Sequence, residues 1–215
     1  MTIPEASELR QGASHLGVEV DADAIGRIGT FIDLLEIWNR RIRLTGDRSR
    51  RVLLRKHVLD SLAVVRELPA TGMVIDLGSG GGFPGIILGC ARPDLTLRLI
   101  EPRRRPTSFL AEAIRTIPLP CARAIAIRGE AAAEEPELAG SARVVTGRAL
   151  RLDTLLALGL PLLRPDGILV AMQTPAVGES SLGDRLRSLG VGLKRSRDYR
   201  LPDGEPRRLL IVSRS

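Results

Sequence analysis

The residues with the clearest chemical meaning are one aspartate and three alternating glycines near residue 80. An apolar run, 74–77, contains Asp76, and Gly78, Gly80 and Gly82 follow at every second position. Glycine adopts positive φ without strain and leaves no side chain in the path of a ligand. The pattern predicts a buried strand, a tight turn and a helix start, whose main-chain N–H groups line a groove for a nucleoside-bearing cofactor.

The spacing of these glycines separates two kinds of cofactor. In the dinucleotide fingerprint G-x-G-x-x-G the third glycine would stand at position 83, which is Phe83. The alternative D-x-G-x-G-x-G is filled at every position, and this pattern resembles the first motif of class I S-adenosylmethionine methyltransferases. Glu101 follows the apolar run 95–100. A carboxylate about 20 positions beyond such glycines can accept hydrogen bonds from both hydroxyls of a ribose. We therefore expect S-adenosylmethionine and not NAD; the alternative is a glycine-rich turn with a surface glutamate.

The apolar periodicity changes near residue 73. Before it, helices are predicted at about 5–16, from Asp21 or Asp23 to about 39, and at about 50–67. After it, strands and helices alternate, which is typical of a parallel doubly wound sheet. The turn-rich residues 202–206 separate two last strands, 195–201 and 207–213, and predict an antiparallel hairpin. The other expected strands are 73–77, 95–100, 122–127, 142–146 and 167–172, and the other expected helices are about 84–91, 104–116, 130–135 and 152–163.

Together these segments predict an α/β fold with two parts. The expected fold is the Rossmann-like class I S-adenosylmethionine-dependent methyltransferase fold, with a mostly parallel sheet and a C-terminal antiparallel hairpin. Residues 1–70 are expected to form a helical extension packed on the core, and residues 71–215 the methyltransferase domain. Phe31 and Trp38 recur at helical spacing within the extension, and we interpret both as core residues rather than ligand-stacking rings.

The composition favours a polyanionic partner. The 215 residues include 32 Lys and Arg against 25 Asp and Glu, and such an excess attracts phosphate. The alternative is a basic surface that is merely solvated.

Cys90 and Cys121 have neither metal-ligand nor disulfide spacing, so we interpret them as small buried residues and expect no metal. Residues 1–10 do not resemble a signal peptide, and no apolar run reaches membrane length, which predicts a cytoplasmic protein without membrane contact.

Several short strings occur in a fixed order along the chain. The most specific are R-x-H-x-L-D-S-L, at residues 55–62, and G-F-P-G, at residues 82–85. Their order resembles the bacterial 16S ribosomal RNA guanine-N7 methyltransferase family, also called glucose-inhibited division protein B, over about residues 30 to 213. The other matching strings are Ile37-Trp38-Asn39, Arg43-Leu44-Thr45, a basic pair before Phe109-Leu110, Gly147-Arg148-Ala149 and Asp203-Gly204-Glu205.

The resemblance implies an activity and a set of site residues. The activity is S-adenosylmethionine-dependent methylation of guanine N7, and the partner is 16S ribosomal RNA or the small ribosomal subunit, with no obligate protein partner. Arg148 would face the methyl-transfer cleft as the catalytic residue. His57, Asp60 and Ser61 would lie where the N-terminal helices meet the cofactor loop. From its residue type we interpret His57 as packed and hydrogen-bonded, the alternatives being that it orients a loop or contacts RNA, and we interpret Asp60 as a capping or paired residue rather than a catalytic one. The implied cofactor-binding residues are Asp76, Gly78, Ser79, Gly80, Gly82, Phe83, Glu101, Gly129, Glu130, Ala131 and Arg148.

Two basic clusters are candidates for RNA contact. One precedes the third helix and continues into it, and the other follows Glu101. Since aromatic residues make up only 2% of the chain, phosphate contact rather than base stacking is expected to be the main attachment. The alternative is a solvated helix face. The candidate RNA-binding residues are Arg43, Arg50, Arg51, Arg55, Lys56, Arg103, Arg104 and Arg105.

The chain also departs from the family at four positions. Arg43 stands where Asn is usual, Gly147 where Ser is usual and Gln173 where Lys is usual, and Pro106 interrupts a stretch that is normally continuous helix. Because Gln carries no charge for a phosphate, a different RNA substrate, a small-molecule substrate and a non-catalytic RNA- or nucleotide-binding role remain alternatives. Guanine N7 has no proton to remove, so no general base is expected and the protein mainly aligns the reactants.

Overall fold

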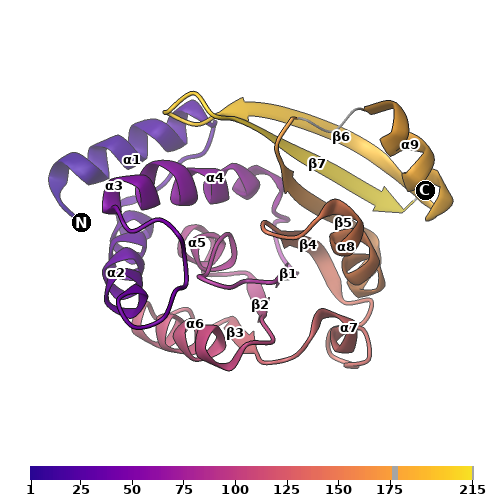
Figure 1. Cartoon of the computed structure of the whole chain (residues 1–215), viewed down its shortest axis with the longest axis horizontal. Coiled ribbons are helices and arrows are strands. Elements are labelled where there is room, and N and C mark those ends of the chain that lie inside the picture. The colour runs from indigo at the N-terminus through magenta and orange to yellow at the C-terminus, as the bar shows by residue number, and fades with distance from the viewer. Residues whose placement is uncertain (176–178, 215) are drawn as a thin grey trace.

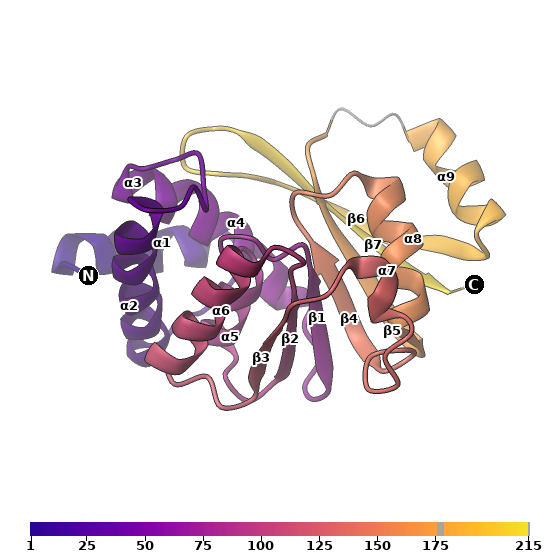
Figure 2. The ribbon, with the colours of Figure 1, turned by 60° about the horizontal axis from the view of Figure 1, so that its bottom comes forward.

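A single mixed sheet runs through the molecule (Figures 1 and 2). The computed structural model describes residues 1–175 and 179–214, and within them seven strands pair in the order β3-β2-β1-β4-β5-β7-β6. The first five strands are parallel, and β7 is antiparallel to both β5 and β6. The predicted mostly parallel sheet with a C-terminal hairpin is therefore confirmed. The strands are β1 (Met73–Leu77), β2 (Thr96–Ile100), β3 (Ala122–Ile125), β4 (Ala142–Gly147), β5 (Leu163–Gln173), β6 (Val191–Arg200) and β7 (Pro206–Arg214).

Helices cover both faces of this sheet. Figure 2 shows α1, α2, α4, α5 and α6 on one side and α7, α8 and α9 on the other. The order of the strands reverses between β1 and β4. A crevice forms at the carboxyl ends of the strands at such a switch point. The helices are α1 (Ile3–His15), α2 (Ala22–Asn39), α3 (Arg50–Val52), η1 (Leu53–Val58), α4 (Leu59–Leu62), η2 (Ala63–Glu67), α5 (Gly85–Ala91), α6 (Arg104–Thr116), α7 (Gly129–Ala132), α8 (Leu152–Gly159), η3 (Leu160–Leu162) and α9 (Glu179–Ser188).

The first strand and helix cap follow directly from local chemistry. Of the two aspartates that could begin α2, the structure selects Asp21, whose Oδ1 accepts a hydrogen bond from the main-chain N–H of Ala24 at 2.6 Å. This bond satisfies one of the unpaired donors at the start of the helix.

β1 consists of apolar side chains around Asp76, and residues 74–77 are all buried. Its burial places Asp76 inside the molecule at the edge where the crevice lies.

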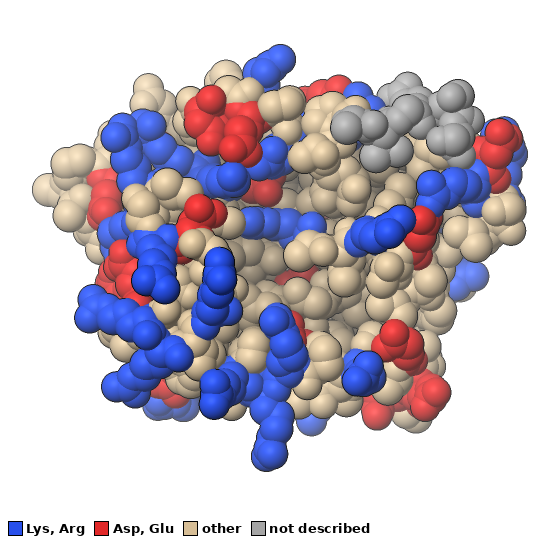
Figure 3. Space-filling view, in the orientation of Figure 1, with Lys and Arg blue, Asp and Glu red and all other residues tan. Residues whose placement is uncertain are grey.

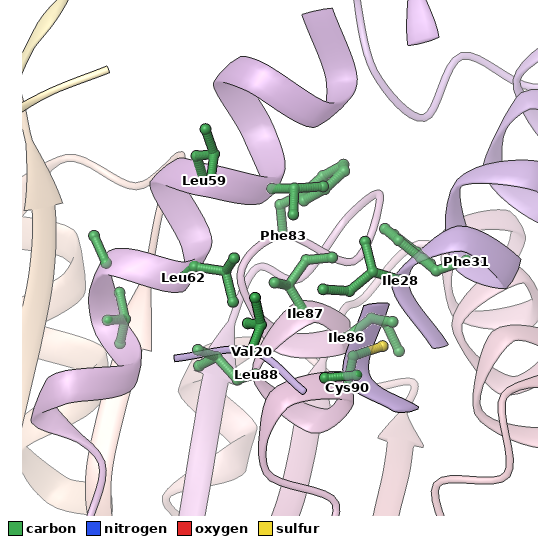
Figure 4. Close-up of a cluster of buried hydrophobic side chains, with 14 of the residues drawn as sticks. Val20, Ile28, Phe31, Leu59, Leu62, Phe83, Ile86, Ile87, Leu88 and Cys90 are labelled. Carbon is green, nitrogen blue, oxygen red and sulfur yellow. The ribbon is translucent and has the colours of Figure 1, made fainter. Parts of the chain in front are cut away.

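The N-terminal helices share a hydrophobic core with the sheet. Figure 4 shows the buried cluster to which Ile28 and Phe31 of α2, Leu59 and Leu62 of α4 and the side chains of α5 belong. The four named side chains of α2 and α4 are at most 1% exposed, and full burial of such a side chain stabilises a fold by about 1.5–3 kcal/mol. The same cluster continues into residues of β1 and β2. The cluster contains residues from both sides of residue 70, so the core crosses the predicted domain boundary. That boundary stays a prediction.

Some of the observed elements differ from those predicted. The helix expected over 50–67 is an uninterrupted helical run, but it includes the π-helical η1 and the 3₁₀-helical η2. The helix expected to reach 163 ends at Gly159, and after η3 the strand begins at Leu163 rather than 167. Pro161 explains this early end, because it donates no main-chain hydrogen bond to a continuing helix. α9, whose composition is strongly polar, was not predicted.

Two single-residue expectations were also wrong. Pro106 does not interrupt α6, because it lies in the first turn of that helix, where an N–H would have no intrahelical partner in any case. Cys121 is exposed, whereas Cys90 is buried as expected. Cys121 precedes β3, at the margin of the sheet, and therefore lies outside the core.

Candidate active site

The loop after β1 has the shape that its glycines predict. Gly78, Gly80 and Gly82 have φ values of +71°, +51° and +88°, a region in which other residues are strained. A Cβ on Gly82 would lie 2.9 Å from Ile86 and 3.0 Å from Phe31, whereas a Cβ on Gly80 would have no such neighbour closer than 3.6 Å. Gly82 therefore permits close packing of the loop on the core, while a side chain at Gly80 would contact Arg103 and Glu101.

Asp76 presents an unused acceptor to this loop. Its side chain is fully buried, and Oδ2 accepts a hydrogen bond from the main-chain N–H of Gly85 at 3.0 Å. Oδ1 is buried and has no partner among the described residues. Burial raises the pKa of Asp76 to about 7, because a carboxylate loses its hydration in the interior. A ligand that brings a positively charged donor would satisfy Oδ1, and the ammonium group of S-adenosylmethionine is such a donor.

Glu101 lies opposite, at the end of β2, and is 2% exposed. Oε2 accepts a hydrogen bond from the N–H of Gly80 at 3.0 Å, and Oε1 accepts one from the N–H of Arg103 at 3.0 Å. The Arg103 guanidinium also donates to both oxygens, at 2.8 and 3.3 Å. Burial by itself would raise the pKa of Glu101, but the hydrogen bonds from Arg103 and Gly80 outweigh it, and the pKa lies below its ordinary value. The ionised carboxylate suits ribose hydroxyls, which would share it with Arg103 or displace that side chain.

The remaining candidate cofactor residues fall into two places. Ser79 is buried, and its hydroxyl donates to the main-chain oxygen of Asp76 at 3.0 Å, which fixes the turn. Phe83 is 8% exposed, and its ring packs 5.3 Å from that of Phe31. Gly129, Glu130 and Ala131 begin α7, which follows β3. Their contact with adenine stays a prediction, as does contact of Phe83 with the cofactor.

Arg148 follows β4 directly and reaches into a cluster of polar side chains. Its guanidinium contacts His57 Nδ1 and lies over the ring of Phe83, with Cζ 5.4 Å from the ring centroid. Its Nε is 3.7 Å from Asp60 Oδ2, and its Nη1 is buried without a partner among the described residues. Burial lowers the pKa of Arg148. The structure therefore joins Arg148, His57, Asp60 and Phe83, which the sequence named separately.

His57 and Asp60 are held in place by further contacts. His57 Nε2 lies 2.7 Å from Asp47 Oδ2, and burial together with the charge of Arg148 lowers the pKa of His57 to about 4. Asp60 Oδ1 accepts a hydrogen bond from the hydroxyl of Tyr199 at 2.6 Å, while burial raises the pKa of Asp60. The interpretations of His57 as a packed, hydrogen-bonded residue and of Asp60 as a paired one are confirmed. His57 is neutral near pH 7, so Arg148 meets no second positive charge there.

A cavity of about 350 Å³ opens beside Arg148. Its walls come from the N-terminal helices, the loop after β4, the end of β5 and the final hairpin. It lies at the strand carboxyl ends, on the face where Figure 3 shows a central hollow. Gln173, one of the departures from the family, is at its edge. The lining residues are Asp60, Arg148, Ala149, Leu150, Arg151, Met172, Gln173, Thr174 and Arg207.

Sequence reasoning missed Tyr199 and Arg207, which complete this cluster from the C-terminal hairpin. Tyr199 is 139 residues from Asp60 along the chain, and Arg207 Nε lies 3.6 Å from Asp60 Oδ1. Neither belongs to a motif near the cofactor loop, so no local signal identifies them. Antiparallel pairing of β6 with β7 places them opposite each other, at Tyr199↔Arg207.

Arg50, a predicted RNA-binding residue, lies among three carboxylates. Its guanidinium is 2.8 Å from Glu5, 2.6 Å from Asp33 and 2.8 Å from Glu36. Arg50 therefore links α3 to α1 and α2, and its charge is compensated within the protein. Two further candidates are paired in a similar way: Arg55 with Glu8, and Lys56 with Glu205. RNA contact by these three residues stays a prediction, and we expect them to act mainly on stability.

The other candidates are exposed. Arg43, Arg51, Arg104 and Arg105 have no ion pair within residues 1–175 and 179–214, whereas Arg103 is exposed but paired with Glu101. Figure 3 shows Lys and Arg gathered over α2 and α6, on the lower left of the face that holds the central hollow. The structure thus separates compensated from uncompensated arginines, which the sequence could not.

The described residues contain no group of His, Cys, Asp and Glu that could hold a metal ion. In the same part of the chain, none of the helices has the length and apolarity needed to cross a membrane.

The model of the family described as "GidB: rRNA small subunit methyltransferase G" matches residues 25–182. A ribosomal RNA small subunit methyltransferase G of Geobacter sp. (strain M21) is 34% identical over 99% of this chain and 100% of its own length. A protein of the same name from Halorhodospira halophila is 38% identical over 80% of this chain and 79% of its own length.

Solved structures with low sequence identity share the fold. M. jannaschii TYW2, in complex with AdoMet, has a TM-score of 0.58 and 15% identity over 74% of this chain and 76% of that chain. The antibiotic-resistance methyltransferase Kmr has a TM-score of 0.54 and 20% identity over 66% of this chain and 86% of that chain. These likenesses support the predicted fold class.

Proposed function

Because the chain belongs to the rRNA small subunit methyltransferase G family, we propose that it methylates N7 of a guanine in 16S ribosomal RNA, with S-adenosylmethionine as the methyl donor. The observation that carries this proposal is the likeness, over almost the full chain, to relatives of that name. The chemistry around the loop after β1 supports it, since Asp76 Oδ1 is a buried acceptor without a partner in the described chain, and Glu101 is bonded to the N–H of Gly80 as an ionised carboxylate.

In this proposal residues at the ends of β1 and β2 and after β3 would hold the cofactor. Asp76 Oδ1 would accept a hydrogen bond from the ammonium group, and Glu101 would accept hydrogen bonds from the ribose hydroxyls. Gly129, Glu130 and Ala131 at the start of α7 would border the adenine. When bound, S-adenosylmethionine supplies a sulfonium-activated methyl group. The protein therefore needs to align this group with the N7 lone pair and to exclude water.

The target guanine enters the 350 Å³ cavity beside Arg148. The buried Nη1 of Arg148, unpartnered within the described chain, is free to donate to an acceptor such as guanine O6. N7 has no proton, so no side chain has to act as a base. Methylation leaves a positive charge on the guanine, and the carboxylate of Asp60 in the wall of the cavity favours that charge.

The test is methyl transfer to ribosomal subunits that lack the modification. Purified small subunits are incubated with the protein and labelled S-adenosylmethionine, and the modified nucleoside is located in the RNA by mass spectrometry. We expect one N7-methylguanosine in 16S RNA and none in large-subunit RNA. Gly80→Val is the matched control, since a branched side chain at φ +51° would fill the cofactor space. Methylation of another RNA, of small molecules only, or of nothing would refute the proposal.

A further inference from the structure

A second cavity lies outside the cofactor and target sites, between the end of α2 and the first turn of α6. Its volume is about 260 Å³, and it is lined by Ile37, Trp38, Arg41, Ile42 and Arg105. Drug-sized ligands occupy cavities of about 300–1,000 Å³, so this one suits a single planar ring. Arg105 lies in the first turn of α6, and the hydroxyl of Thr107 in the same helix donates to the main-chain oxygen of Glu101 at 2.7 Å, so the cavity lies beside the helix that contacts Glu101.

The apolar wall of this cavity is exposed and fixed in position. Trp38 was expected to be a core residue, but it is only half-buried; one side of the indole packs on Phe109, with ring centroids 5.7 Å apart. Ile37 beside it is 54% exposed. The turn that follows is held by Asn39, whose Oδ1 accepts hydrogen bonds from the N–H groups of Leu44 and Thr45 at 2.9 and 3.2 Å. An aromatic surface is therefore presented to solvent by a rigid support.

The polar wall of the cavity is cationic and uncompensated. Arg41 and Arg105 are exposed, and neither forms an ion pair with any residue that the structure describes. Arg40, Arg43 and Arg104 nearby are likewise exposed and unpaired in that part of the chain. Figure 3 shows a basic area over α2 and α6, the helices that end and begin beside this cavity. In contrast, Arg50 on α3 is fully engaged by carboxylates.

We propose that this cavity binds one unpaired base of the substrate RNA, stacked on Trp38, with the adjoining phosphates held by Arg41 and Arg105. The inference rests on the proposed function for the class of polymer. An aromatic face with arginines at its rim is the combination that single-stranded RNA requires, because the ring stacks on a base while the guanidinium groups bind phosphate. A site next to the cofactor crevice would hold the strand that delivers the target guanine.

Trp38 provides a direct readout, because it is the only tryptophan in the chain. The full-length protein is titrated with a short single-stranded oligoribonucleotide while its tryptophan emission is followed. An abasic ribose-phosphate oligomer of equal length is the control. We expect saturable quenching by the first and little change with the second, since only a base can stack on the indole. Equal quenching by both oligomers would mean that the cavity binds phosphate and no base, which would overturn the proposal.

Three variants complete the test. Trp38→Leu should weaken RNA binding roughly 5- to 100-fold without changing its salt dependence, whereas Trp38→Phe should retain most of the affinity. Arg105→Gln should flatten the salt dependence by about one unit and leave S-adenosylmethionine affinity unchanged. Melting temperatures confirm that each variant folds. If wild-type protein methylates 16S RNA but Trp38→Leu binds RNA normally, the cavity is not a base site; if wild-type protein methylates no RNA, the proposed function itself fails.

Discussion

The protonation of Asp76 should control the affinity for S-adenosylmethionine. Its Oδ1 is buried without a partner in the described chain, and burial raises the pKa of Asp76 to about 7. The ionised form attracts an ammonium group, while the protonated form does not. Affinity should therefore rise with pH through this value and fall on acidification. His57 does not interfere, because its pKa is lowered to about 4.

The size of the effect follows from one proton that must leave before binding. With a pKa of about 7 for Asp76, affinity should fall about eightfold between pH 7.5 and pH 6. The upper limit of pH 7.5 keeps the amino group of the ligand mostly protonated, since α-amino groups titrate near about 7.7–8.0. Asp76→Asn removes the charge, and loss of a charge-assisted hydrogen bond of about 1.5–3 kcal/mol predicts a roughly 10- to 100-fold weaker complex.

The assay is isothermal titration calorimetry with S-adenosylmethionine at several pH values, for the wild type and for Asp76→Asn. The variant should show weaker binding and a much flatter pH profile. The melting temperature of the protein without ligand, measured across the same pH range, tests the same pKa of Asp76. Because the folded state holds the proton of Asp76 up to about pH 7 while the unfolded chain releases it near 3.8, the wild type should lose stability relative to the variant as pH rises between these values. An affinity that is equal at pH 6 and pH 7.5, or unchanged in the variant, would refute this role of Asp76.

Five further substitutions probe other contacts. Gly80→Val should abolish S-adenosylmethionine binding by calorimetry, because a branched side chain is strained at φ +51° and would crowd the loop beside Glu101; unchanged affinity would exclude this loop as the cofactor site. Arg103→Ala should tighten that binding a few-fold, because the ribose no longer competes for Glu101; weaker binding would mean that Arg103 contacts the cofactor. Arg50→Ala should destabilise the fold by about 1–2 kcal/mol, seen as a lower melting temperature, and should leave the salt dependence of RNA binding unchanged. Arg104→Ala should instead leave the melting temperature unchanged and flatten the salt dependence of RNA binding by about one unit. Arg148→Ala should slow single-turnover methylation at saturating RNA, and an unchanged rate would show that Arg148 is structural.

The sequence by itself determined the cofactor loop and the order of the elements around it. Asp76, the alternating glycines and Glu101 are local features, since a strand, a tight turn and a following strand end need only neighbouring residues to define them. The change from helical periodicity to strand and helix alternation near residue 73 is equally local, and the sheet confirms it. The C-terminal hairpin could be predicted because a turn-rich segment separates two strand-like runs.

Only the tertiary structure decided which side chains meet and which charges are free. Tyr199 reaches Asp60 across 139 residues, and Arg148 reaches His57 across 91, because sheet pairing and helix packing bring distant segments together. In the sequence, Arg50 and Arg105 are equivalent cations. In the fold, three carboxylates surround Arg50, while Arg105 borders a cavity beside Trp38. A residue's charge is fixed by its type, but the neighbours that compensate it depend on contacts that sequence spacing does not encode.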